Sequence, residues 1–264
     1  MLEVKHIDKT FYPGTVSEKT AIRDLSVTFH DGDFVTVIGG NGAGKSTLLN
    51  LIAGVFPVDY GDILLDGENI TNYPEHRRAR LLGRVFQDPM MGTAANMGIE
   101  ENLAMAMRRG KTRGLAWGIR KEERKLYRDK LALLGLGLED RMTAKVGLLS
   151  GGQRQALTLL MATLQKPKLL LLDEHTAALD PATAQTVLAA SDKIIAENGL
   201  TAMMVTHNMK DAIAHGNRLI MMSEGRIILD IQGEDKKKLT KADLLQKFAE
   251  VSGTQEESDK VLLS

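Results

Sequence analysis

The 264-residue sequence predicts an α/β fold built on a mostly parallel sheet. Short apolar runs typical of strands alternate with segments of helical periodicity along most of the chain. A glycine-rich loop separates one such strand from the helix that follows it. A block rich in Met, Ala, Leu, Glu, Lys and Arg, at about residues 88–150, interrupts the alternation. We expect this block to form a helical subdomain inserted into the sheet.

The first elements follow from local patterns. Alternating apolar and polar residues predict half-buried strands at Leu2–Ile7 and Ile22–Phe29. Phe34–Ile38 is apolar, rich in strand formers and ends at glycines, which predicts a buried strand running into a loop. Helical periodicity follows over Ser46–Val55. Further short strands are predicted at Asp62–Leu65 and Arg84–Phe86.

Strands and helices alternate again after the helical block. Leu169–Leu172 is too short and too apolar for anything but a buried strand. The other predicted elements are helices at Gly151–Leu164 and Ala182–Glu197 and strands at Thr201–Thr206, Arg218–Met222 and Arg226–Asp230. We expect one domain over residues 1–250, followed by a polar tail over residues 251–264 that frays.

Composition excludes several functions. Lys plus Arg and Asp plus Glu both number 34, so the net charge is zero and gives no electrostatic reason to expect nucleic-acid binding. Because cysteine is absent, disulfides, thiolate zinc sites and a cysteine nucleophile are excluded. The amino terminus does not have the pattern of a secretory signal, and no stretch reaches the roughly 20 apolar residues of a membrane helix. We expect a cytoplasmic protein.

The glycine-rich loop fits the phosphate-loop pattern G-x-x-x-x-G-K-[ST] and stands between a predicted strand and a predicted helix. Glycines let backbone N–H groups converge on a phosphate, and the helix adds its positive end. Lys45 would reach the β- and γ-phosphates, while the Ser46 hydroxyl can ligate Mg²⁺. The predicted nucleotide-binding residues here are Gly39, Gly40, Asn41, Gly42, Ala43, Gly44, Lys45, Ser46 and Thr47.

Two carboxylates follow the leucine-rich strand. Asp173 and Glu174 stand where that strand would end, at the sheet edge where ligands bind in open α/β folds. Asp173 would hold Mg²⁺, directly or through water, and Glu174 would accept a proton from the attacking water. The alternative is an acidic cap for the next helix. Because a phosphate loop precedes these residues in the chain, the catalytic interpretation is favoured.

A resemblance becomes specific at Leu149–Gln153, whose sequence LSGGQ resembles the signature motif of ATP-binding cassette (ABC) ATPases. Ser150, Gly151, Gly152 and Gln153 at a helix start would form a second anion site, the alternative being an ordinary serine cap with a Gly-Gly turn. The resemblance implies a phosphate-loop NTPase core with an antiparallel N-terminal β subdomain and an inserted helical subdomain. It also implies a head-to-tail dimer, in which each ATP lies between two copies of the chain.

Other positions follow the order of motifs in this family. Gln87 resembles the glutamine that senses Mg²⁺ and the γ-phosphate, and His207 resembles the histidine that hydrogen-bonds the γ-phosphate. Residues 178–180 resemble the loop that contacts the partner copy. Phe11 is the residue expected to stack on adenine, with Tyr12 as the alternative and a core role for either left open.

Some sequence features fit this pattern less directly. His175 stands where most relatives carry proline and is treated, with the other histidines apart from His207, as a surface or structural residue. The basic run at residues 111–130, which contains Trp117, is interpreted as a solvated helix face, the alternative being a permease or headgroup contact. Lys236–Lys238 is interpreted in the same way.

The resemblance implies an ATPase that acts as a motor subunit. Its cofactors would be ATP and Mg²⁺, and its partners separate transmembrane permease subunits and an extracytoplasmic solute-binding protein. The chain would then lie on the inner face of the cell membrane. The stretches DEHTAALDP, MVTHNMK and NRLIMMSEGRIILD resemble bacterial importers, some of them assigned to aromatic amino acids. A soluble ATPase for assembly work, such as iron–sulfur cluster biogenesis, and an exporter or envelope motor remain as alternatives.

Overall fold

The computed structural model describes residues 1–111 and 118–252, which form two compact units. The first unit combines Met1–Arg78 with the described residues from Leu200 onward, and the second is Ala79–Gly199. Trp117 and residues 253–264 of the expected tail lie outside the described residues. Within the described ranges, none of the helices combines the length and the apolar character needed to cross a bilayer.

The first unit contains an antiparallel sheet made of β1 (Leu2–Phe11), β2 (Lys19–Phe29), β4 (Tyr60–Leu65) and β5 (Glu68–Asn69). The strand order is β2-β1-β4-β5, which confirms the antiparallel N-terminal subdomain that the resemblance implied. In β1, Val4 lies opposite Val27 of β2 and Ile63 of β4, and all three side chains are buried. The alternating pattern seen in the sequence therefore places one face of this sheet in the core.

The same unit contains four strands in the order β10-β9-β3-β8. They are β3 (Phe34–Ile38), β8 (Ala202–Val205), β9 (Arg218–Ser223) and β10 (Arg226–Gln232). β3 is parallel to both β8 and β9, whereas β9 and β10 form an antiparallel hairpin. All five residues of β3 are buried, as a central parallel strand requires.

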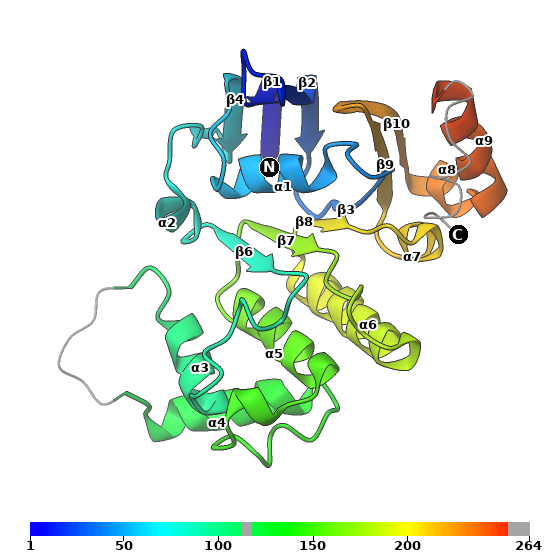
Figure 1. The fold of residues 1–264 in the computed structure, drawn as a ribbon. Helices are drawn as coiled ribbons and strands as arrows, with labels where there is room; N and C mark the ends of the chain where they lie inside the picture. The colour runs from blue at the N-terminus through cyan, green and yellow to red at the C-terminus, as the bar shows by residue number, and fades with distance from the viewer. Residues whose placement is uncertain (112–117, 253–264) are drawn as a thin grey trace. The chain divides into compact units, whose positions relative to one another are not determined.

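Five helices accompany these strands among the described residues of the first unit: α1 (Lys45–Ala53), α2 (Glu75–Arg78), α7 (Met209–Ala214), α8 (Gly233–Lys237) and α9 (Lys241–Ser252). In Figure 1, α8 and α9 lie beside β9 and β10. Leu244 and Phe248 of α9 join Met209 of α7 and Leu219 and Met221 of β9 in one apolar cluster. This cluster fixes the carboxy-terminal helix against the sheet.

A buried arginine closes the end of α1. Arg78 is 1% exposed, and its guanidinium donates four hydrogen bonds to backbone carbonyls. Two of the acceptors are the carbonyl oxygens of Leu51 and Ile52 in the last turn of α1, at 2.7 and 2.9 Å. The others belong to Thr71 and Tyr73, at 2.6 and 2.9 Å. A cation at a helix C-terminus is favoured because it satisfies carbonyls left without partners.

One interpretation of the sequence is wrong for Lys236. The run Lys236–Lys238 was expected to be solvated, but the Lys236 side chain is 2% exposed, while Lys237 and Lys238 are exposed. The Lys236 ammonium donates to the carbonyl oxygens of His215 and Gly216, the latter at 3.0 Å. These carbonyls follow the end of α7, so the buried cation satisfies the same need as Arg78 does for α1.

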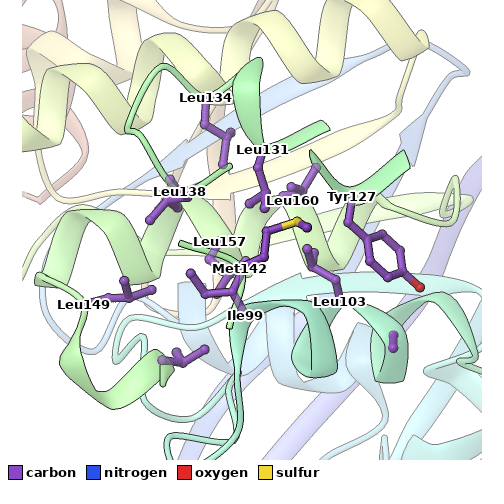
Figure 2. Packing of buried hydrophobic residues seen from close by; sticks show 13 residues of the cluster. Ile99, Leu103, Tyr127, Leu131, Leu134, Leu138, Met142, Leu149, Leu157 and Leu160 are labelled. Carbon is purple, nitrogen blue, oxygen red and sulfur yellow. The ribbon is translucent and has the colours of Figure 1, made fainter. Parts of the chain in front are cut away.

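The second unit contains the parallel strands β6 (Leu82–Val85) and β7 (Leu169–Asp173). Its helices are α3 (Ile99–Met107), α4 (Lys121–Ala132), η1 (Val146–Leu148), α5 (Gly151–Thr163) and α6 (Pro181–Asn198). Residues of α3, α4 and α5 form an apolar cluster, in which Leu103, Tyr127 and Leu157 are fully buried. Figure 2 shows Met142 among these side chains. The helical block therefore has its own core.

The basic run agrees with a solvated helix face where it is described. Of the residues of α4, only Tyr127 and Leu131 are buried. Arg124 of α4 is about half exposed and forms a bidentate ion pair with Glu100 of α3, at 2.6 and 2.9 Å. Because the Glu100 side chain is buried, this pair ties α4 to α3 in addition to the packing of its two apolar residues.

Candidate functional site

The phosphate loop follows β3 directly, and its backbone admits only glycine at two positions. Gly39 has φ 152°, and a Cβ there would lie 2.2 Å from the carbonyl oxygen of Met222. Gly44 has φ 101°, and a Cβ there would lie 2.6 Å from the carbonyl oxygen of Ala21. The close approach of neighbouring strands therefore fixes the course of the loop, which is why the motif needs these glycines.

Lys45 lies inside the loop. Its side chain is buried, and its ammonium donates to the carbonyl oxygens of Gly39 and Gly40 at 2.7 and 3.0 Å. Ser46 is exposed and Thr47 half-buried in the first turn of α1. The loop thus presents a cation and a hydroxyl at a helix N-terminus, an arrangement that suits a phosphate.

His207 leaves the sheet at the same edge as the phosphate loop. β3 and β8 are parallel, with Val37 opposite Val205, so the chain passes beyond both strands in the same direction. His207 is exposed, and the next residue, Asn208, caps α7 by accepting a hydrogen bond from the backbone N–H of Lys210 at 2.9 Å. The first unit therefore brings His207 and the phosphate loop to one edge, as parallel pairing predicts.

The two aromatic candidates differ in their surroundings. The Phe11 ring is half-buried and packs edge-on against Phe56, with the ring centroids 5.2 Å apart. Tyr12 is 68% exposed and has φ 52°, a left-handed backbone that is rare outside glycine. Phe11 is thus fixed by packing, whereas Tyr12 projects outward.

Sequence reasoning missed Lys19. In the strand register it lies directly opposite Phe11. A Cβ built on Gly42 of the phosphate loop would lie 3.2 Å from the Lys19 ammonium nitrogen. This side chain therefore reaches from the strand pair that carries Phe11 to the phosphate loop. No local motif marks it, because its neighbours Phe11 and Gly42 are brought to it by the fold.

In the second unit the carboxylates follow a parallel strand pair. Val85 of β6 lies opposite Leu172 of β7, so Asp173, the last residue of β7, and Gln87, two residues beyond β6, stand at the same end of the two strands. The Arg84 guanidinium lies 3.4 Å from the Asp173 carboxylate, measured from Nη2 to Oδ2, and 4.5 Å above the centre of the ring of the adjacent Phe86. The glutamine and the aspartate are thus brought to one edge of this pair.

Burial raises the pKa of Asp173 above its ordinary value, and the neighbouring charge of Glu174 acts in the same direction. Arg84 opposes this shift without cancelling it. A carboxylate whose charge is this poorly compensated favours the approach of a cation.

Gln87 and Glu174 are held by the segments around them. Gln87 is exposed, while the carbonyl oxygen of the preceding Phe86 accepts a hydrogen bond from the side chain of Gln155 in α5 at 2.9 Å. Glu174 is partly buried and has φ 42°, and its carbonyl oxygen accepts from the N–H of Ala177 at 3.0 Å. A left-handed glutamate costs about 1 kcal/mol or more, and such strain concentrates at functional sites.

The signature segment begins α5. The Ser150 hydroxyl oxygen accepts from the N–H of Gln153 at 3.2 Å, and the Ser150 N–H donates to the Gln153 side chain at 3.2 Å. This is the serine cap that the sequence left as an alternative, here extended to a capping box. Ser150 and Gly151 are exposed, and a Cβ on Gly152 would lie 1.9 Å from Thr183. Anion binding at this helix start stays a prediction.

A glycine-rich loop that encloses a lysine at the start of a helix, together with a buried parallel strand ending in Asp-Glu, defines a phosphate-loop NTPase. The comparisons with known proteins name the family. Residues 22–177 match the protein-family model that is described as ABC transporter. The chain is 44% identical over 248 residues to the tyrosine transport ATP-binding protein of Clostridioides difficile (strain R20291), covering 94% of this chain and 98% of that protein. The chain therefore belongs to the ABC transporter family, as its ATP-binding and ATP-hydrolysing subunit.

Other similar proteins belong to the same family. The chain is 34% identical over 243 residues to the ABC transporter ATP-binding protein YxdL of Bacillus subtilis (strain 168), covering 89% of each. It is 35% identical to the spermidine/putrescine import ATP-binding protein PotA of Haemophilus influenzae, with 87% of this chain matching 57% of that protein. Among solved structures, the cassette MJ0796, a dimer in a post-hydrolysis state bound to ADP and Pi, has a TM-score of 0.74 and 28% identity, covering 88% of this chain and 98% of that one.

Proposed function

We propose that this chain couples ATP hydrolysis to the uptake of an amino acid of the aromatic class through separate permease subunits. The observation that carries the proposal is the 44% identity, over nearly the whole of both chains, to a tyrosine transport ATP-binding protein. Import stands in the names of more distant relatives, the spermidine/putrescine import proteins. Those names support uptake as the direction of transport, and the higher identity to the tyrosine transport protein favours the amino acid over the polyamine.

The first unit would bind the nucleotide. Phe11 stacks on adenine, and the loop amides together with Lys45 hold the β- and γ-phosphates. The position of the Lys19 ammonium over Gly42, opposite Phe11, suits a contact with phosphate oxygens between the base and the loop. His207 hydrogen-bonds the γ-phosphate, because the parallel pairing of β3 and β8 brings it to the loop's edge.

Mg²⁺ fits the residues present. Ser46, Gln87 and Asp173 offer oxygen ligands, the type that this ion prefers. The raised pKa of Asp173 indicates a carboxylate whose burial is poorly compensated, so a bound cation would stabilise its charged form. When bound, Mg²⁺ would neutralise charge on the β- and γ-phosphates.

Hydrolysis would proceed by in-line attack of water on the γ-phosphorus. Glu174 accepts the proton of the attacking water as the new P–O bond forms, and the bond to the oxygen that bridges the β- and γ-phosphates breaks. The products are ADP and inorganic phosphate. Because the residues assigned to this reaction are divided between the two units, we propose that both act as one nucleotide-binding domain over residues 1–250, with the helical part at 88–150.

A second copy of the chain would complete each ATP site. Ser150, Gly151, Gly152 and Gln153 of that copy approach the γ-phosphate, with the positive end of α5 facing the anion. The exposure of Ser150 and Gly151 and the dimeric state of the similar cassette MJ0796 support this arrangement. Opening and closing of the dimer would drive permease subunits that receive solute from an extracytoplasmic binding protein, with this chain on the inner membrane face.

Reconstitution tests the proposal. The chain is purified with its native membrane partners and placed in vesicles. ATPase turnover is then measured with tyrosine or spermidine in the presence of the solute-binding protein from the same organism. Stimulation by tyrosine and not by spermidine is expected. Stimulation by spermidine alone, or a partner that is a soluble scaffold, would contradict the proposal. Glu174→Gln tests the chemistry separately, since it should bind ATP, hydrolyse it very slowly and accumulate as a dimer on size-exclusion chromatography.

A further inference from the structure

His175 is a buried polar residue that the proposed chemistry does not use. Its side chain is 2% exposed, and its Nε2 lies 3.1 Å from the hydroxyl oxygen of Ser191 in α6. Ser191 is itself 1% exposed, and its hydroxyl donates to the backbone carbonyl oxygen of Val187 at 2.8 Å. The imidazole is therefore joined through a buried hydroxyl to the backbone of a helix.

This chain of contacts fixes which imidazole nitrogen carries a proton. A serine hydroxyl has one hydrogen, and Ser191 gives it to the Val187 carbonyl. Its oxygen can then only accept from the imidazole, so His175 donates through Nε2–H. The contact is thus a directed hydrogen bond with a fixed donor, which holds the ring in one orientation.

The residue before His175 is Glu174, whose φ of 42° lies in the left-handed region. The turn is closed by the hydrogen bond from the N–H of Ala177 to the carbonyl oxygen of Glu174. A strained residue keeps its conformation only where its surroundings hold it. His175 supplies a side-chain anchor one residue from the strained position, and the anchor is on α6. A proline at position 175 would restrict the backbone but could not reach Ser191.

We propose that His175 is a positioning residue for Glu174. Its Nε2–H bond to Ser191 ties the turn after β7 to α6 and so holds the glutamate where it can accept a proton from water. The proposal rests on the function assigned to Glu174 above. According to this proposal, turnover depends on the hydrogen bond between His175 and Ser191 and not on the volume of the buried imidazole ring.

A double-mutant cycle in the full chain tests this. Ser191→Ala removes the acceptor, and His175→Leu removes the donor while keeping an apolar side chain. Each is expected to lower kcat for ATP about tenfold, with KM for ATP within about twofold of wild type, because positioning affects the reaction more than ground-state binding. The double variant should be no slower than the slower single variant, since both remove the same bond.

Two further variants separate positioning from folding. Thr186→Ala is the matched control, because Thr186 of α6 makes the same bond to the carbonyl four residues earlier, that of Ala182, but lies exposed. Its kcat should equal that of wild type. His175→Gln retains an N–H donor at a similar reach and should keep kcat within about threefold of wild type while Ser191 is present. If His175→Leu does not fold, the cycle is run with His175→Gln, whose kcat should then fall about tenfold on adding Ser191→Ala.

Unchanged kcat in Ser191→Ala, or multiplied effects in the double variant, would overturn the proposal. So would a fall in melting temperature with no fall in kcat. Glu174→Gln is measured alongside. If it turns over normally, the assignment of the base is wrong; if it is inactive while Ser191→Ala is normal, only the role of His175 fails.

Discussion

Replacing Arg78 by methionine tests how the end of α1 is held. Methionine has a similar length and no charge, so the change removes four hydrogen bonds and leaves four backbone carbonyl oxygens in a buried site. Arg77 provides the control, because it is the same residue type in the same short helix but is exposed.

The expected loss can be worked out from two opposing terms. A hydrogen bond from a charged donor is worth about 1.5–3 kcal/mol, so four of them contribute roughly 6 kcal/mol at the lower end. Burial lowers the pKa of Arg78 from its ordinary value to about 10, and this shift corresponds to a desolvation cost of about 3 kcal/mol that methionine avoids. The net destabilisation should therefore be about 3 kcal/mol.

Differential scanning calorimetry of the nucleotide-free chain measures this loss. For a chain of this size, 3 kcal/mol corresponds to a fall in melting temperature of about 6–12 °C. Arg77→Met should change it by less than about 2 °C, because surface substitutions usually lie within about 0.5 kcal/mol. Equal melting temperatures for the two variants would refute the reasoning, since the buried hydrogen bonds would then contribute nothing.

Two further predictions concern charges at the proposed site. Lys19→Met should weaken ATP binding about fivefold at low salt and less at high salt, measured by titration with a fluorescent ATP analogue, whereas Lys5→Met, on the neighbouring strand, should have no effect; equal behaviour of the two would remove Lys19 from the site. The pKa of Asp173 is raised in the folded state, so its charge costs stability at pH values above that pKa, and the cost is lost as the pH falls through it. Asp173→Asn should therefore melt at or above the wild-type temperature at pH 7.5 without nucleotide, the difference shrinking toward pH 4, and a clearly lower melting temperature at pH 7.5 would contradict this.

The sequence predicts most of the fold because its strong patterns are local. Phe34–Ile38 is a run of apolar strand formers that ends at glycines, and the strand has the same bounds in the structure. The helix after the Ser-Gly-Gly turn ends within one residue of its expected bound, since a capping residue marks its start. The phosphate loop is likewise contiguous, so its role can be inferred from a spacing.

What the sequence could not predict depends on contacts between distant segments. Nothing local distinguishes Arg78 from the exposed Arg77, or Lys236 from the exposed Lys237 beside it. In both pairs the buried cation is the one that donates hydrogen bonds to backbone carbonyl oxygens at the end of a helix elsewhere in the chain. Lys19 lies opposite Phe11 through the register between β1 and β2, and its ammonium approaches Gly42, which is distant in sequence. These residues share no motif, and a charge pattern alone favours exposure for all of them.

The two sets of proposed site residues differ in how the surrounding structure holds them. The phosphate loop is fixed from several sides, by the close approach of Ala21 and Met222 to its glycines and by Arg78 at the far end of α1, so the rest of the first unit sets the course of its backbone. The carboxylate segment carries costs instead: a left-handed Glu174 and a buried Asp173 with a raised pKa. Such unfavourable features persist only where neighbouring contacts hold the segment in place. The hydrogen bond from His175 to Ser191 is one of these contacts. A cation that binds Asp173 would relieve the cost of burying its charge, so the second unit should gain stability if such a cation is bound there.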